Sequence, residues 1–237
     1  MKKLAKSLLM VASFALLAGQ LSAEVINVNW NRWDTPGVNI MTNAPGQAVL
    51  DDSGTAGVWN NAGVGGTATD VLDSEGNATT VDIDVGINGN WYFNPYPTTL
   101  PAAVVNDYVS LNSGAGGTVV TNDITISGLQ AGQEYEIAFL GHGDNLNQSA
   151  TYTFDGTSKT IAPSSFGSVW VDGENYTTFS LTSDASGEIT GTWQNSDTVQ
   201  YAGMGGLQIA VIPEPATLGL LGIFALAMAW YRRKFIR

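Results

Sequence analysis

Three aromatic residues just after position 90 are the most direct candidates for ligand binding. Trp91, Tyr92 and Tyr96 lie in the segment 91–97, which also contains Phe93 and two prolines. Because strict alternation of apolar and polar residues stops here, the segment is expected to form a loop with exposed rings. Sugar rings stack on such flat surfaces, which predicts contact with a surface polysaccharide. The alternative is that these rings plug one end of a domain.

Other tryptophans divide into surface and core candidates. Four of them are candidates to join the same surface: Trp30, Trp33, Trp59 and Trp170. Trp193 shares a strand face with Ile189 and is therefore expected in the core.

Oxygen-bearing side chains at 144–147 suggest a cation site. Asp144, Asn145 and Asn147 stand together in a loop, and carboxylate and amide oxygens are the ligands that Ca²⁺ prefers. No EF-hand pattern accompanies them, and turns rich in Asn and Asp also form for backbone reasons alone. Calcium is the only cofactor that the residues suggest.

Residue types that catalyse reactions are sparse. His142 is the only histidine, and no Gly-x-Ser-x-Gly sequence accompanies it, so a Ser-His-Asp triad is disfavoured. Asp82 and Asp84, like Glu134 and Glu136, alternate with apolar residues and are expected on a solvated strand face. No catalytic residue is assigned, and the chain is predicted not to be an enzyme. A glycan-active enzyme with two carboxylates remains an alternative.

Charge is distributed unevenly along the chain. Seven of the nine basic residues lie near the two ends, which leaves Arg32 and Lys159 within residues 24–212. Of the 21 acidic residues only Glu214 lies outside that range, so the central body holds twenty acidic and two basic side chains. A body of such negative charge repels nucleic acid and anionic lipid, which are excluded as partners.

The central body reads as a series of short strands. Period-two alternation or β-rich composition predicts strands at residues 25–30, 81–85, 107–111, 119–126, 134–139, 150–154, 177–181, 188–193 and 206–211. Gly-rich turn clusters separate them, and no amphipathic helix of ten residues stands out. The chain has no cysteine, so core burial must stabilise the domain. These features predict an all-β fold, an antiparallel β-sandwich with jelly-roll topology, over residues 24–212.

Two segments of the body resemble known domains. Residues 126–137 (ISGLQAGQEYEI) resemble the strand-turn-strand of many secreted β-sandwiches, and residues 205–209 (GGLQI) resemble the closing strand of galactose-binding-like and malectin-like jelly rolls. The resemblance covers about a quarter of the body and transfers no binding residue.

The N-terminus has the three parts of a signal peptide. Lys2, Lys3 and Lys6 precede an apolar stretch at 8–18, which is too short to span a bilayer. Small residues then lead to Ala23, after which cleavage is expected. Residues 1–23 therefore predict export through the Sec translocon and removal by signal peptidase. An uncleaved N-terminal anchor is the alternative.

The C-terminal segment, residues 213–237, also has three parts. Pro213, Glu214 and Pro215 precede an uncharged apolar run at 216–231, and a basic tail at 232–237 follows. The prolines favour an extended, accessible backbone. The apolar run predicts a transmembrane helix, and the basic tail predicts that its end lies in the cytoplasm. An ordinary single-pass anchor is the alternative.

This C-terminal arrangement resembles the PEP-CTERM sorting signal. The motif Pro213-Glu214-Pro215, the single span and the basic tail all match. The resemblance implies recognition by an exosortase, a membrane-embedded cysteine transpeptidase. It also implies a precursor anchored in the inner membrane of a bacterium, with the mature domain at the cell surface or outside the cell. The sequence thus predicts an exported, non-catalytic β-sandwich that binds polysaccharide, with a purely structural or adhesive matrix protein as the alternative.

Overall fold

The computed structural model describes residues 25–30, 37–40, 49–50, 57–63, 65–92, 107–113, 118–141, 143–165, 169–195 and 201–213, with backbone alone at 37–40 and 92. The expected signal peptide with Ala23, the residues Glu214 and Pro215, the apolar run and the basic tail lie outside the described residues. Every strand belongs to one compact unit, residues 22–211. Within the described segments, no helix has the length and hydrophobicity needed to cross a bilayer.

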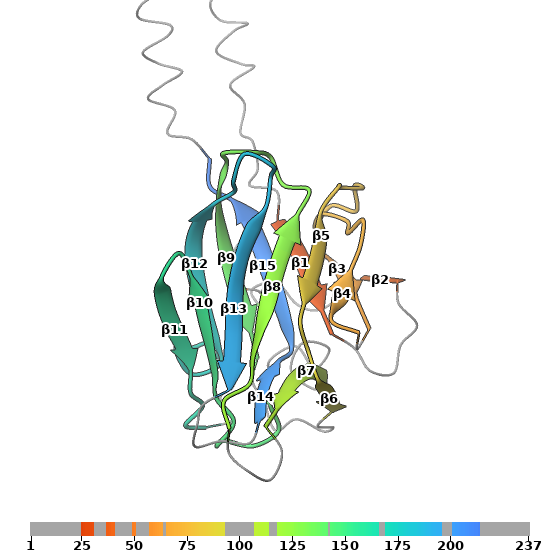
Figure 1. Ribbon diagram of the computed structural model, residues 1–237. Helices are drawn as coiled ribbons and strands as arrows, with labels where there is room; N and C mark the ends of the chain where they lie inside the picture. Colours follow the sequence, from red (N-terminus) through yellow and green to blue (C-terminus); the bar gives the residue numbers. More distant parts are fainter. Residues whose placement is uncertain are drawn as a thin grey trace, which may run out of the picture. The chain divides into compact units, whose positions relative to one another are not determined.

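Three β-sheets form the described fold (Figure 1). Sheet A has the order β12 (Tyr176–Thr182), β9 (Glu134–Leu140), β15 (Gly206–Val211), β1 (Val25–Asn29), β3 (Val58–Asn61) and β2 (Gly37–Ile40). Sheet B has the order β11 (Thr157–Ile161), β10 (Ala150–Phe154), β13 (Ile189–Asn195), β8 (Thr121–Ser127), β5 (Asp82–Val85) and β4 (Thr67–Ala68). The end sheet consists of β14 (Tyr201–Met204), β7 (Asp107–Asn112) and β6 (Gly89–Tyr92) and is drawn at the lower end of Figure 1.

The described fold is an all-β sandwich, as the sequence predicts. No helix occurs among the described residues, and the strand pairs are antiparallel except for β1 and β3, which run parallel. Alternate side chains from sheets A and B fill the space between them: on β9, Tyr135, Ile137 and Phe139 are buried while Glu134 is exposed. Period-two alternation therefore identifies the face of β9 that belongs to the main core, whereas Ala138 and Leu140 on the other face are buried in a second apolar cluster with Trp59.

An aromatic stack connects the two sheets. The ring centroid of Phe139 on sheet A lies 4.4 Å from that of Tyr152 on sheet B, and Tyr152 lies 6.2 Å from Trp193. Trp193 is fully buried, and its Nε1 donates a hydrogen bond to the carbonyl oxygen of Gly86 at 2.8 Å. The prediction that Trp193 belongs to the core is confirmed.

Asn27 and Asn29 alternate with apolar residues, which predicts one solvated face on β1, and this prediction is wrong. All five of its residues are buried, including Asn27 and Asn29. The side chain of Asn27 donates to the carbonyl of Val58 at 3.1 Å, and its Oδ1 accepts from Gln208 Nε2 at 2.7 Å. Gln208 in turn accepts from the backbone N–H groups of residues 49 and 50. Amides that look solvent-facing in the sequence are thus buried and hydrogen-bonded on the outer face of sheet A.

Six short strands escape prediction from the sequence, namely β2, β3, β4, β6, β11 and β14. The clearest case is β11, which pairs with β10 through the two-residue turn Asp155-Gly156. Both turn residues have positive φ, 47° and 73°, as a type I′ hairpin turn requires. The Asp-Gly pair is a recognised hairpin signal, so the hairpin was accessible to sequence reasoning even though β11 itself is almost entirely exposed.

Candidate functional site

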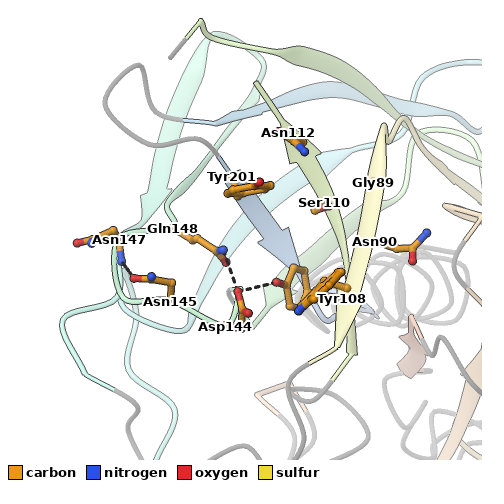
Figure 2. A pocket seen from close by; sticks show the side chains of 11 residues that line it. Gly89, Asn90, Tyr108, Ser110, Asn112, Asp144, Asn145, Asn147, Gln148 and Tyr201 are labelled. Atoms are coloured by element: carbon orange, nitrogen blue, oxygen red, sulfur yellow. Dashed lines mark hydrogen bonds between the residues drawn. The ribbon is translucent and has the colours of Figure 1, made fainter. Parts of the chain in front are cut away.

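A cavity of about 700 Å³ opens at the end of the sandwich where the end sheet lies. Eleven residues from three regions line it (Figure 2). β6 and β7 contribute Gly89, Asn90, Trp91, Tyr108, Ser110 and Asn112, the loop after β9 contributes Asp144, Asn145, Asn147 and Gln148, and β14 contributes Tyr201. The volume is in the range typical of small-molecule sites.

Tyr108 and Asp144 form a hydrogen-bonded pair in the cavity. Tyr108 is buried, and its hydroxyl donates a hydrogen bond of 2.8 Å to Asp144 Oδ1. Burial, and secondarily this bond to a carboxylate, raise the pKa of Tyr108 well above its usual value. The phenol therefore stays protonated and acts as a permanent donor to Asp144.

Gln148 is the second donor to the same carboxylate oxygen. Its Nε2 lies 2.9 Å from Asp144 Oδ1, and its backbone N–H donates to the carbonyl of Asn145 at 2.9 Å. Figure 2 shows Tyr108, Asp144 and Gln148 joined by these side-chain bonds, with Tyr201 nearby and Asn145 and Asn147 to one side. Two neutral donors thus fix the orientation of the carboxyl group.

Two glycines let the chain approach closely around this group. A Cβ at Gly143 would overlap the side-chain oxygen of Gln148. A Cβ at Gly203 on β14 would lie 2.5 Å from the backbone nitrogen of Gly143 and 3.0 Å from Cδ2 of Tyr108. A Cβ 2.5 Å from a backbone nitrogen does not occur in real structures, so a larger residue at position 203 would displace the chain at Gly143. A larger residue at position 143 would require the side chain of Gln148 to move.

Exposed aromatic rings gather at this cavity. Among the described side chains, five large hydrophobic residues are exposed: Trp91, Val119, Val169, Val171 and Tyr201. The two aromatic ones, Trp91 at 52% exposure and Tyr201 at 38%, both line the cavity. The strand β6 that presents Trp91 is paired with β7, and Asn88 and Asn112 exchange two hydrogen bonds of 2.7 and 2.9 Å beside this pair. The rings are therefore presented by paired strands.

The candidate sugar-binding residues fall partly within the described structure. Trp91 lies on β6, so the expectation that it belongs to a loop is wrong, although its ring is exposed as expected. The backbone of Tyr92 belongs to the same strand, and Tyr96 lies outside the described residues. That the segment contacts a polysaccharide stays a prediction.

The remaining tryptophan candidates do not join this surface where they are described. Trp30 and Trp59 are buried, and the ring of Trp170 packs edge-on against Tyr176 at 6.4 Å. None of the three lines the cavity. Trp33, like His142, lies outside the described residues.

The candidate calcium residues all line the cavity, but two of their side-chain oxygens accept hydrogen bonds from within the protein. Asp144 Oδ1 accepts the two bonds described above, and Asn145 Oδ1 accepts from the backbone N–H of Asn147 at 3.0 Å, which closes a local turn. Within the described segments, no group of three or more His, Cys, Asp or Glu residues could hold a metal ion. The geometry adds no support to the calcium prediction.

Both carboxylate pairs lie on outer strand faces, as the sequence predicts. Asp84 and Glu134 are exposed, and Asp82 and Glu136 are half-buried. Glu134 accepts a hydrogen bond from the Ser180 hydroxyl at 2.8 Å. Neither pair lines the cavity.

Seven of the eleven lining residues are not singled out by the sequence, and Tyr108, Gln148 and Tyr201 are the most important of them. Tyr108 reads as an ordinary apolar position of a predicted strand, and Tyr201 precedes a short Gly-containing segment without alternation. Gln148 directly follows the candidate cation residue Asn147, and this position is the signal in the sequence that points to Gln148.

Comparison with known proteins does not assign the chain to a family. No protein family and no curated protein matches it. The enzymatically active domain of tailspike protein 4 from bacteriophage CBA120 is 13% identical, with 56% of this chain and 18% of that chain covered and a TM-score of 0.28. A sugar phosphate isomerase of the cupin superfamily from Silicibacter pomeroyi is also 13% identical, with 54% and 76% covered and a TM-score of 0.17. The chain thus spans less than a fifth of the tailspike chain, and TM-scores this low support no conclusion.

Proposed function

We propose that the β-sandwich is a non-catalytic carbohydrate-binding domain and that the cavity at the end sheet is its binding site. The observation that carries this proposal is that the two exposed aromatic rings of the described residues, Trp91 and Tyr201, lie on one cavity. The other side chains that line it are amides, the hydroxyls of Tyr108 and Ser110, and the carboxylate of Asp144. Aromatic faces stack on the apolar faces of sugars, and side-chain amides donate to and accept from sugar hydroxyls. This combination suits an uncharged, hydroxyl-rich ligand.

Charge argues against anionic ligands. Asp144 is the only charged side chain among the described residues that line the cavity, and the body has twenty acidic residues against two basic ones. Nucleic acid, phosphorylated compounds and acidic lipid headgroups would meet repulsion at every distance. A glycan without acidic groups is the partner that this field permits.

The number of carboxylates supports a binding role over glycoside hydrolysis. Hydrolysis of a glycosidic bond ordinarily uses two carboxyl groups within about 5 to 10 Å of each other. Asp144 is the single carboxylate among the described lining residues, and Tyr108 and Gln148 occupy one of its oxygens. The site as described lacks the second group.

We also infer jelly-roll topology for the sandwich. Eight strands pair as β1 with β15, β8 with β13, β9 with β12 and β10 with β11, each pair antiparallel. In chain order these are pairs of first with eighth, second with seventh, third with sixth and fourth with fifth. This is the pairing of a four-pair ribbon wrapped into two sheets, which is the jelly roll.

We propose that the chain reaches the cell surface by a PEP-CTERM route. The support is the sequence of the two ends: a signal peptide cut after Ala23, and Pro213-Glu214-Pro215 before the apolar run and basic tail. Exosortase would act on the motif while the span holds the precursor in the inner membrane. Glu214→Ala is expected to leave a full-length membrane form, and mass spectrometry of the mature protein checks this. An intact Arg237 in wild-type protein from a host with active exosortase would refute the proposal.

Sugar binding is tested by paired variants at the cavity. Trp91→Ala and Tyr201→Ala should each weaken retention on polysaccharide columns by about tenfold or more, since each removes a stacking surface of roughly 100 Å². Val169→Ala is the matched control, because it removes an exposed apolar side chain that does not line the cavity. Equal retention of all three variants, or no retention of wild type by any polysaccharide, would favour the structural or adhesive alternative.

A further inference from the structure

The carboxylate of Asp144 is the one feature of the cavity that a neutral sugar does not explain. Asp144 is half-buried, and both hydrogen bonds to its side chain come from neutral donors and end on the same oxygen, Oδ1. No described residue bonds to Oδ2 or forms an ion pair with this group. A negative charge held partly out of water without a positive partner is unfavourable unless a ligand provides one.

The surroundings of Asp144 favour a positively charged partner. Trp91, Tyr108 and Tyr201 line the same cavity, and aromatic faces attract ammonium groups through their quadrupole. Lys159, the one basic residue of the body that is described, donates to the carbonyl of Thr178 at 2.6 Å and lies 5.1 Å from the ring centre of Phe179, on strands that do not line the cavity. The excess of acidic residues over the body further attracts cations from solution.

We propose that the cavity selects a glycan that carries free amino groups, with the ammonium paired to Asp144 and the sugar ring stacked on Trp91 or Tyr201. This inference rests on the proposed carbohydrate-binding function and adds the chemical class of the sugar. Tyr108 and Gln148 act as positioning residues, because they hold Oδ1 and leave Oδ2 for the ligand. N-acetylation of the sugar would remove the charge and thereby the reason for selection.

The test compares three oligosaccharide series of equal length on the full chain. These are glucosamine, N-acetylglucosamine and glucose oligomers, titrated by calorimetry at about pH 6, where amines are protonated and carboxyl groups ionised. The chain is held in a polyoxyethylene detergent, which has neither a sugar nor an ammonium headgroup. Wild type should bind the glucosamine series at least tenfold more tightly than the other two, and this preference should shrink as salt is raised.

Two variants that each remove one negative charge distinguish the effect of Asp144 from the effect of the protein's net charge. Asp144→Asn keeps the shape of the side chain and should abolish the preference for the glucosamine series. Glu134→Gln, on the outer face of β9, removes the same charge away from the cavity and should keep the preference. Melting temperatures of both variants report whether the fold is intact, and the wild-type comparison of the three series does not depend on either variant.

Three other outcomes would each overturn the amino-sugar inference. If wild type binds neutral and amino oligomers equally, the amino-sugar inference fails and the carbohydrate-binding proposal stands. If Glu134→Gln loses the preference as fully as Asp144→Asn, the selection comes from the net charge and the inference also fails. If no series binds, the amino-sugar inference fails, and retention on the polysaccharide columns decides the carbohydrate-binding proposal separately.

Discussion

Replacing Tyr152 with Phe should stabilise the protein, although it deletes a polar group and adds none. Tyr152 is fully buried in the aromatic stack, and its hydroxyl has no hydrogen-bond partner among the described residues. A buried hydroxyl without a partner costs about 1–3 kcal/mol, whereas the void left by its removal costs about 0.3 kcal/mol. Tyr152→Phe is therefore expected to raise the free energy of unfolding by about 1–2 kcal/mol and the melting temperature by roughly 2–8 °C.

The matched control is Tyr135→Phe on β9. Tyr135 is equally part of the core, but its hydroxyl accepts a hydrogen bond from the backbone N–H of Gln130 at 3.0 Å. Loss of that bond should lower the free energy of unfolding by about 0.5–1.5 kcal/mol. Both variants can be measured by urea unfolding followed through tryptophan fluorescence, provided that the transition is two-state. Destabilisation by Tyr152→Phe would refute the reasoning, because it would mean that the hydroxyl has a partner.

Two further predictions concern the core and one turn. Trp193→Ala should lower the free energy of unfolding by about 3–5 kcal/mol, because the ring is fully buried and its Nε1 bonds Gly86; a loss below about 1 kcal/mol in urea unfolding would contradict its place in the core. Asp184 accepts hydrogen bonds, in decreasing order of effect, from the side chain of Ser186 and from the backbone N–H groups of Glu188 and Ser186, and these bonds lower its pKa below the ordinary value. Its contribution to stability is therefore complete above the unfolded-state pKa and is lost as the pH falls through the folded-state pKa. Asp184→Asn should differ most from wild type near neutral pH and least in strong acid, and a difference that grows on acidification would have the wrong sign.

The strands that the sequence predicts well are those with one buried and one solvated face. On β5, the buried residues Ile83 and Val85 alternate with the half-buried Asp82 and the exposed Asp84, and the pattern identifies both the strand and its orientation. The same reasoning fails on β1, because Asn27 is buried in a network with Gln208 that joins residues 181 positions apart. Polarity indicates exposure only when no other part of the chain covers that face.

The sequence likewise predicts individual residues of the candidate site but not that they lie together. Trp91 and Asp144 were each singled out, one for sugar stacking and the other for calcium, but nothing in their spacing indicates that they share a cavity. Their proximity depends on the pairing of β6 with β7 and on the hydrogen bond from Tyr108 on β7 to Asp144. Such non-local contacts follow from strand topology, which local patterns do not encode.

The most direct test of the central claim is an NMR titration of indole N–H resonances with an oligosaccharide that the protein retains. Trp91 is half-exposed on the cavity, whereas Trp193 is fully buried between the sheets, so the two provide a signal and an internal control in one spectrum. Saturable shifts of Trp91 with Trp193 unchanged are the predicted result. An unchanged Trp91 resonance at saturating ligand would contradict the assignment of the cavity as the carbohydrate-binding site.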